Sequence, residues 1–176
     1  LQDYIGEKTL NQGFKKFIDN AAFRPKAPFA TSNEWYGYIK EVTPDSLQYY
    51  LEDSFEKITL YTNKVSEATF KKLDNNTFEV QLTVESAKNY YDGNGKELSA
   101  PTQSNLLDIA VFQNDTIIDG KTKKVPLILE KKWIKPGKST FTFVTNKEPI
   151  KAGIDPYNKM IDRIPDDNLK SLDELE

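Results

Sequence analysis

The chain has 176 residues, of which 38% are hydrophobic and 29% are charged, with 24 basic and 27 acidic residues and a formal net charge of −3. This size supports one large or two small domains, and the charge balance argues against a strong field for nucleic acid or anionic lipid. Histidine and cysteine are both missing, which excludes a Ser-His-Asp triad, a Cys-His pair and a histidine base, and argues against a zinc centre built by this chain alone.

The opening residues have the pattern of a helix end. Leu1, Tyr4 and Ile5 are spaced as on one helical face, and Gly6 suits the backbone turn that follows a helix. Because the chain does not begin with methionine, we expect this helix to start in a preceding part of a larger protein.

Three further helices are predicted before residue 58. The first has an apolar stripe at helical spacing and ends before Pro25, and the second follows a capping box formed by Thr31 and Glu34. The third is expected to begin with Thr43 as its cap. Its predicted buried face consists of Leu47, Tyr50, Leu51 and Phe55.

After about Ile58 the apolar period changes from 3.6 to 2, which indicates strands. The clearest strand spans Thr77–Glu85, and the Asn75-Asn76 turn predicts a hairpin with the segment before it. Further strands are expected around 107–111, 125–129 and 140–144.

These patterns predict an α+β protein in which a short helical bundle precedes an antiparallel β-sandwich of immunoglobulin-like type. We expect a helical segment at residues 1–58, a β-sandwich at 59–157 and a polar C-terminal tail at 158–176. The end of this tail, Lys170 to Glu176, is expected to be frayed.

Two acidic segments are candidates for a calcium site. The segment Asp92–Glu97 superficially resembles a calcium loop, but the twelfth position is Gln103 rather than glutamate, so a hairpin turn is the better interpretation. The second grouping would bind calcium only if the tail folded back on itself, and acids near a terminus are more often solvated. Its members are Asp155, Asp162, Asp166 and Asp167.

A run of lysines flanks the strand near 125–129. It could form a phosphate or nucleic-acid surface, but lysines on an edge strand also prevent edge-to-edge pairing, and we favour that interpretation. Pro126 likewise predicts a sheet edge or a bulge. The run consists of Lys121, Lys123, Lys124, Lys131, Lys132, Lys135 and Lys138.

Several aromatic residues could line a sugar-binding face, although aromatics are also ordinary core and strand residues. They are Tyr49, Tyr50, Tyr90, Tyr91 and Trp133. Carboxylate pairs for glycoside hydrolysis meet only in the fold, so a carboxylate-dependent hydrolase has no positive support. We assign no catalytic, cofactor-binding or metal-ligating residue.

Several motifs resemble the zinc aminopeptidases of the aminopeptidase-N type. Leu1–Glu7 (LQDYIGE), followed by Phe14–Ile18, is similar to the stretch shortly after the catalytic tyrosine of that family. Other segments resemble a bacterial subgroup in which the peptidase is fused behind an ABC-transporter-type permease. These are Thr43–Tyr49, Leu51–Ile58, Lys151–Lys159 and Ile161–Arg163, so the resemblance spans essentially the whole chain.

The resemblance implies the end of a helical catalytic domain followed by a β-sandwich. The family holds zinc with a His-Glu-x-x-His motif and a downstream Glu, binds the substrate amine with a Gly-x-Met-Glu-Asn type segment, and stabilises the oxyanion with a tyrosine. None of these motifs occurs here, and all would precede Leu1, so zinc belongs to the parent protein. The implied partners are the upstream catalytic domain and, through it, a peptide substrate, with no nucleic acid and no direct membrane insertion. The implied parent is attached to a membrane of the bacterial cell envelope.

We therefore expect a non-catalytic scaffold that supports and shields an active-site domain. Its helices should expose an apolar patch, to which Leu1, Tyr4 and Ile5 contribute. The alternative is an independent immunoglobulin-like module that binds protein or glycan through its loops, although such modules rarely carry a helical first third.

Overall fold

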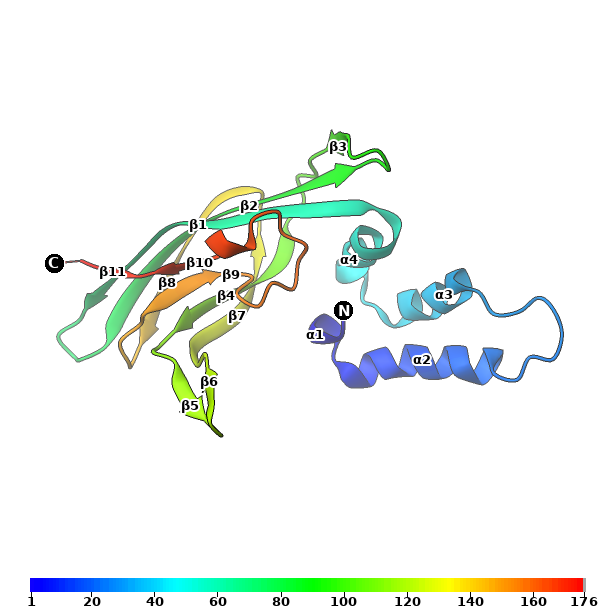
Figure 1. Ribbon diagram of the computed structural model, residues 1–176, viewed down its shortest axis with the longest axis horizontal. Helices are drawn as coiled ribbons and strands as arrows, with labels where there is room; N and C mark the ends of the chain where they lie inside the picture. Colours follow the sequence, from blue (N-terminus) through cyan, green and yellow to red (C-terminus); the bar gives the residue numbers. More distant parts are fainter. Residues whose placement is uncertain (176) are drawn as a thin grey trace. The chain divides into compact units, whose positions relative to one another are not determined.

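The computed structural model describes residues 1–175, except for the side chains at positions 118 and 121, and divides the chain into two compact units. Leu1–Ile58 form a helical unit and Thr59–Glu176 a β unit. Figure 1 shows helices in the first unit and a multi-stranded arrangement in the second, which confirms the predicted α+β class.

The helical unit begins with a short helix and two longer ones. Gly6, with φ of 81°, separates α1 from α2, as its position after a helix end predicted. Helices α2 and α3 pack closely at Gly13, where an added Cβ would lie 3.0 Å from Val42 and 3.1 Å from Ile39. The elements are α1 (Gln2–Ile5), α2 (Glu7–Ala21), α3 (Ser32–Val42), η1 (Asp45–Leu47), α4 (Gln48–Leu51) and η2 (Glu52–Glu56).

One of the two predicted helix caps is confirmed. The Thr31 hydroxyl accepts a hydrogen bond from the backbone N–H of Glu34 at 3.2 Å, which is one half of the predicted capping box, whereas the Glu34 carboxylate binds Arg24 at 2.7 Å. The Thr43 cap was predicted wrongly, because its hydroxyl donates to the carbonyl of Ile39 at 2.8 Å and η1 starts after Pro44 without a side-chain cap. Thr43 therefore bonds back to the helix before it.

The predicted buried face of the third helix is only partly correct. Leu47 and Leu51 are buried, but Phe55 is 53% exposed. The segment Glu52–Glu56 is π-helical, and the N–H of Lys57 bonds to the carbonyl of Glu52 at 3.0 Å. The Phe55 ring packs against Trp35 and Tyr36 of α3, with ring centroids 5.5 and 5.4 Å apart.

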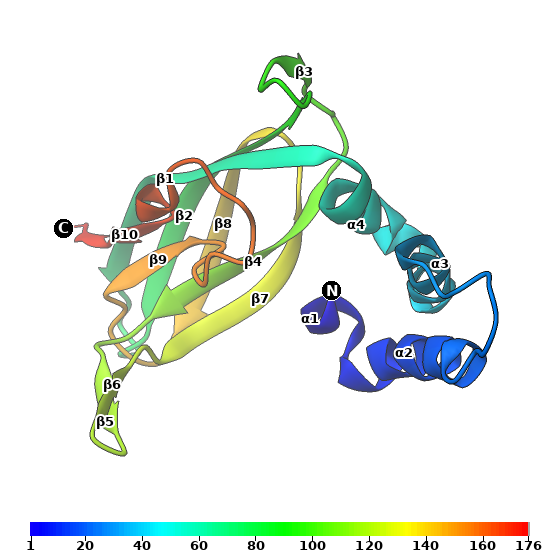
Figure 2. The same cartoon turned by 45° about the vertical axis from the view of Figure 1, so that its right-hand side comes forward.

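The β unit contains two larger sheets and a small hairpin (Figure 2). One sheet has the order β11-β1-β2, with β8 and β3 both pairing with β2; the other has the order β10-β9-β4-β7. The strands are β1 (Ile58–Lys72), β2 (Phe78–Tyr91), β3 (Glu97–Ser99), β4 (Asn105–Phe112), β5 (Thr116–Ile118), β6 (Lys121–Lys123), β7 (Pro126–Ile134), β8 (Gly137–Thr145), β9 (Lys151–Ile154), β10 (Leu169–Ser171) and β11 (Asp173–Glu174).

Two predicted strand features are confirmed. The turn at Asn75-Asn76 joins β1 to β2, and Asn76 has a positive φ of 61°. Pro126 lies at the start of β7, which is the last strand of its sheet, and the register shifts where Pro126 faces Phe112. Both an edge and a bulge are therefore present at this proline.

The core of the β unit is shared by both sheets. Val80, Leu82 and Val84 on β2 belong to one cluster with Leu107, Ile109 and Val111 on β4, and Leu82 and Ile109 are 0% exposed. These alternating residues of β2 and β4 thus share one core. In β4 the intervening residues Asp108, Ala110 and Phe112 are buried as well, so this strand is covered on both faces.

The chain after residue 157 is part of the β unit. Leu169 pairs with Gly153 in β9, and Asp173 lies beside Thr69 in β1, while Met160 and Leu172 pack against the core. Residues 170–175 thus differ from the frayed end that we expected, because their backbone continues both sheets. Glu176 lies outside the described residues.

Candidate functional site

Two of the acidic tail residues, Asp155 and Asp162, accept hydrogen bonds from backbone N–H groups. The two carboxylate oxygens of Asp155 accept the N–H groups of Lys159 and Met160, each at 2.9 Å. Asp162 accepts the N–H of Asn63 at 2.8 Å and that of Ile164 at 2.9 Å. The tail does fold back, but onto β1, and residues 1–175 contain no group of three potential metal-ligating side chains.

Asp155 is an unusual carboxylate because it is buried. Burial raises the pKa of the Asp155 carboxyl, and the nearby carboxylates of Asp108 and Asp162 raise it further, whereas the two backbone N–H groups oppose this rise. The residue also has a positive φ of 42°, which aspartate tolerates better than most residues.

Sequence reasoning missed the charged cluster around Asp108. The side chain of Asp108 is 5% exposed, and its oxygens accept hydrogen bonds from Lys131 and Lys159, each at 2.6 Å. Lys131 faces Asp108 directly in the β4–β7 register. A single acid within an otherwise apolar strand was the signal that could have revealed this cluster. Because each carboxylate oxygen has a lysine partner, and Lys159 belongs to the loop after β9, the arrangement fixes this loop to the sheet.

The segment Asp92–Glu97 is a hairpin turn, as expected. Asp92 Oδ1 accepts the N–H groups of Asn94 and Lys96 at 2.9 and 2.8 Å, and Gly95 has a φ of 81°. The Asp92 side chain therefore closes the turn between β2 and β3.

The lysine run is divided among different roles. Lys132 pairs with Glu130 at 2.6 Å on β7, and Lys138 lies 3.4 Å from Glu85, so most of its members lie on or beside edge strands. On β7 this arrangement fits the edge-protection interpretation, whereas β8 carries only Lys138, near its start. The side chain of Lys121 lies outside the described part of the chain.

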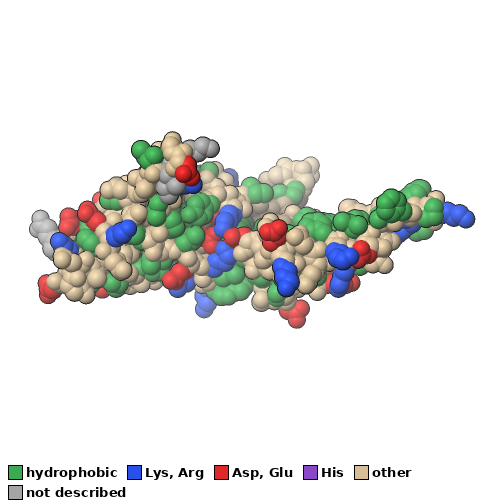
Figure 3. Space-filling view, turned by 90° about the horizontal axis from the view of Figure 1, so that it is seen from below, with side chains coloured by type: hydrophobic (Ala, Val, Ile, Leu, Met, Phe, Trp, Pro, Cys, Tyr) green, Lys and Arg blue, Asp and Glu red, His purple; other side chains and the backbone are tan. Residues whose placement is uncertain are grey.

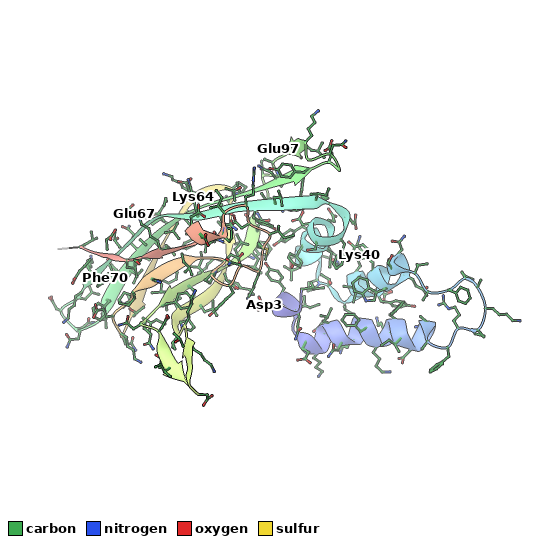
Figure 4. All side chains as sticks on the ribbon, viewed as in Figure 1. Asp3, Lys40, Lys64, Glu67, Phe70 and Glu97 are labelled. Atoms are coloured by element: carbon green, nitrogen blue, oxygen red, sulfur yellow. The ribbon has the colours of Figure 1, made fainter. Side chains whose placement is uncertain are left out.

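The candidate sugar-binding aromatics belong to different units. Tyr50 of the helical unit packs edge-on against Tyr4, with ring centroids 4.9 Å apart. In the β unit the Tyr91 hydroxyl donates to Glu97 and accepts from Arg163, both at 3.2 Å (Glu97 is labelled in Figure 4), and Trp133 on β7 is 52% exposed. The candidate rings are thus divided between the two units, and Tyr50, Tyr91 and Trp133 have other partners or lie on separate elements.

The helical unit carries a continuous apolar surface, called here the aromatic face and formed by Phe14, Ile18, Trp35 and Phe55. The ring of Trp35 lies 6.0 Å from Phe14 and 5.5 Å from Phe55, and Ile18 follows Phe14 by one helical turn. Phe14, Ile18 and Phe55 are 36%, 56% and 53% exposed. Figure 3 shows hydrophobic side chains along the helical unit on the right of the view.

The aromatic face is not made of the residues that the sequence predicted. Leu1, Tyr4 and Ile5 are half-buried, and Tyr4 already packs against Tyr50. Sequence periodicity placed the apolar side chains of these helices on one side, but it did not show which of them the neighbouring helices would cover.

A hollow of about 320 Å³ lies at one end of the aromatic face. It is lined by Ser32, Asn33, Trp35, Tyr36, Phe55 and Glu56. The Tyr36 hydroxyl donates to Glu56 at 2.6 Å, and Lys40 (labelled in Figure 4) reaches the same oxygen at 3.3 Å.

These polar groups are mutually compensated. Burial, followed by the hydrogen bond to Glu56, raises the pKa of the Tyr36 hydroxyl well above its ordinary value. The hydrogen bonds from Tyr36 and Lys40 lower the pKa of the Glu56 carboxyl. The phenol of Tyr36 is neutral, and the carboxylate of Glu56 is paired with Lys40. The aromatic rings are therefore the main groups that this surface offers to a partner.

Comparisons with family models, curated protein sequences and solved structures give no match. Within residues 1–175, no helix combines the length and the apolar character needed to cross a bilayer.

Proposed function

We propose that this chain is the non-catalytic C-terminal accessory region of a zinc-dependent aminopeptidase. In this proposal the helical unit packs its aromatic face against the upstream catalytic domain of the same polypeptide. The observation that carries the proposal is the exposure of Phe14, Ile18 and Phe55 beside Trp35, on helices whose opening sequence resembles that family.

The physical argument concerns burial. Large contiguous apolar surfaces on small proteins mark contacts with other domains or proteins, and burying apolar area contributes roughly 25 cal/mol per Å². Docking would fix the positions of α2 and α3, and a rigid support of this kind matters because small displacements at a catalytic centre lower the rate steeply. The β unit would shield or orient the cleft.

We also propose that the sandwich is immunoglobulin-like. Its strand order supports this: β1, β2 and β8 lie in one sheet, and β7, β4, β9 and β10 follow one another in the other. In chain order these strands correspond to A (β1), B (β2), C (β4), C′ (β7), E (β8), F (β9) and G (β10). Strands A, B and E then share one sheet and strands C′, C, F and G the other, as in an immunoglobulin-type fold.

Zinc does not fit this chain and is assigned to the parent. The sequence has no histidine or cysteine, and the carboxylates of Asp155 and Asp162 accept hydrogen bonds from backbone N–H groups. The parent would be attached to the membrane of a bacterial cell envelope and would bind the peptide substrate in its catalytic domain.

The alternative is an independent immunoglobulin-like module that binds protein or glycan. The separate core of the β unit favours it, since this unit carries its own packed interior. The coding sequence distinguishes the two: a long upstream reading frame with His-Glu-x-x-His favours the peptidase, whereas a start codon just before Leu1 favours the module.

Metal content and peptidase assays test the proposal on the protein itself. The purified chain should bind no stoichiometric zinc and should not cleave an aminoacyl-anilide. Detection of either activity in the pure chain would refute the assignment.

A further inference from the structure

Strand β8 is a long strand at the edge of its sheet. It pairs with β2 over nine consecutive positions, from Gly137 opposite Ser86 to Thr145 opposite Phe78, with no register shift, and its other side has no strand neighbour among residues 1–175. In an antiparallel strand, alternate residues direct their N–H and C=O groups to each side. One side of β8 therefore presents a row of unpaired backbone groups.

The other strands at the ends of the sheets are short or carry features that hinder pairing. Strand β7 carries Pro126, a register shift and lysines, and β3, β10 and β11 are only three, three and two residues long. Strand β8, with the sequence GKSTFTFVT, contains no proline and has lysine only near its start. Proteins commonly protect a long edge strand, so an unprotected one is a template for strand addition.

A hollow at the end of β8 can receive a side chain. It has a volume of about 200 Å³ and lies between the start of β7 and the end of β8. Its lining comprises Leu127, Ile128, Val144, Thr145, Asn146 and Lys147. Successive side chains of an added strand alternate between the two faces of the sheet. Every second side chain therefore lies on the same face as this hollow, and an apolar one next to it can enter it.

The charges around β8 indicate the chemistry of the occupant. Lys135 precedes the strand and Lys147 follows it, and neither has an ion-pair partner among the described residues, while Lys138 lies 3.4 Å from Glu85. Uncompensated cations at both ends favour acidic groups at the ends of an added strand. They disfavour a second copy of β8, which would bring further lysines to the same edge.

We propose that β8 binds an extended peptide by strand addition, and that this peptide has apolar or β-branched residues at alternate positions and acidic residues near its ends. Backbone hydrogen bonds would supply the pairing, the hollow would select an apolar side chain, and the flanking lysines would attract the acidic ends. This site is independent of the aromatic face of the helical unit.

A nonapeptide with the sequence of residues 78–86 (FEVQLTVES) is a suitable probe. This segment already pairs with β8 on its inner side and has acids near both ends. The fluorescein-labelled peptide should bind the intact chain saturably in anisotropy measurements. Hydrogen exchange should become slower at alternate amides of residues 138–144. No saturable binding up to about 1 mM peptide, or protection elsewhere than β8, would overturn the proposal.

N-methylated peptides distinguish strand addition from nonspecific adhesion. One peptide carries N-methyl groups at Val80, Leu82 and Val84, and the other at Glu79, Gln81 and Thr83. Since an added strand uses only one of its edges, one peptide should bind and the other should not. Equal binding of both peptides contradicts strand addition.

Charge reversal tests the selectivity. The double variant Lys135→Glu/Lys147→Glu should weaken binding about five- to tenfold, with the loss reduced at high salt. The matched control Lys8→Glu/Lys26→Glu changes the same charge in the helical unit and should bind like the unaltered chain. An equal loss in both variants contradicts local recognition. Peptide-free association of the chain that protects the β8 amides would show that a second copy is the occupant, which overturns the peptide proposal.

Discussion

The two units differ in how far their apolar side chains are buried. The β unit encloses its core between two sheets, so that Leu82, Ile109 and Ile154 are 0% exposed. The helical unit instead leaves Ile18 and Phe55 more than half exposed, and Phe23 in the loop after α2 is 101% exposed. In the accessory-region proposal, this difference corresponds to a β unit with its own enclosed core and a helical unit whose exposed apolar side chains contact a partner.

The largest contrast is expected from truncating one apolar side chain in each unit. Leu82→Ala removes a side chain that is 0% exposed and should lower the free energy of unfolding by about 3 to 4 kcal/mol. Phe23→Ala should change it by less than about 0.5 kcal/mol, because this ring is fully exposed. Urea unfolding of both variants measures the difference, and similar losses would contradict the comparison.

Glycine-to-alanine substitutions should act with opposite signs in the two units. A Cβ at Gly153 in β9 would collide with the backbone carbonyl oxygen of Asn168, so Gly153→Ala should destabilise by about 1 to 3 kcal/mol. Gly37 lies in α3 with nothing within 4 Å of an added Cβ, so Gly37→Ala should stabilise by about 0.5 to 1 kcal/mol. Thermal unfolding measures both changes, and destabilisation by Gly37→Ala would show that α3 is packed more tightly than the structure indicates.

Ion pairs should also differ between the units. Asp108→Asn leaves Lys131 and Lys159, both about one-third exposed, without their shared carboxylate, and should cost about 2 kcal/mol. Asp19→Asn breaks an exposed pair with Lys15 and should cost less than about 0.5 kcal/mol. If chemical denaturation shows equal costs, the Asp108 cluster does not hold the loop to the sheet.

The smallest expected effect is a difference in the response to acid. The Arg24 guanidinium lowers the pKa of the Glu34 carboxyl in the helical unit, so the stabilisation present above the ordinary glutamate pKa is lost as the pH falls through the lowered value. Burial raises the pKa of Asp155, so its ionised form costs free energy at higher pH, and this cost is removed as the pH falls through the raised value.

Hydrogen exchange, corrected for the intrinsic rate, measures this response locally. Acidification should lower the protection of the amides near residues 31–35. It should raise the protection of the amides in the loop that Asp155 bonds, at residues 155–160. Glu34→Gln and Asp155→Asn should each flatten the response in its own unit only. A change of the same sign in both loops would contradict the assigned electrostatics.

The sequence predicted the longer elements because their periodicity is repeated many times. Helix α2 and strand β2 each carry a full apolar stripe, and the turn at Asn76 has a residue suited to positive φ. Strands β9, β10 and β11 have two to four residues, too few for a pattern to appear.

The remaining features depend on contacts between residues far apart in sequence. Asp162 bonds to the backbone of Asn63, and Lys159 bonds to Asp108, so the tail becomes part of the β unit. The segment that contains Phe55 is π-helical, which no pattern in the sequence predicted. The sequence therefore predicted an exposed apolar patch on the helices, but only the structure showed which residues form it.

The most direct test of the accessory-region proposal compares this chain with the full-length product of its gene. Zinc content and aminoacyl-anilide hydrolysis are measured for both, and for the full-length Ile18→Asp/Phe55→Asp variant with Lys8→Glu as control. The account predicts zinc and activity only in the full-length protein, with kcat lowered about tenfold or more by the aromatic-face variant at unchanged zinc content. Zinc-dependent hydrolysis by the chain alone, or a full-length product without either property, would contradict it.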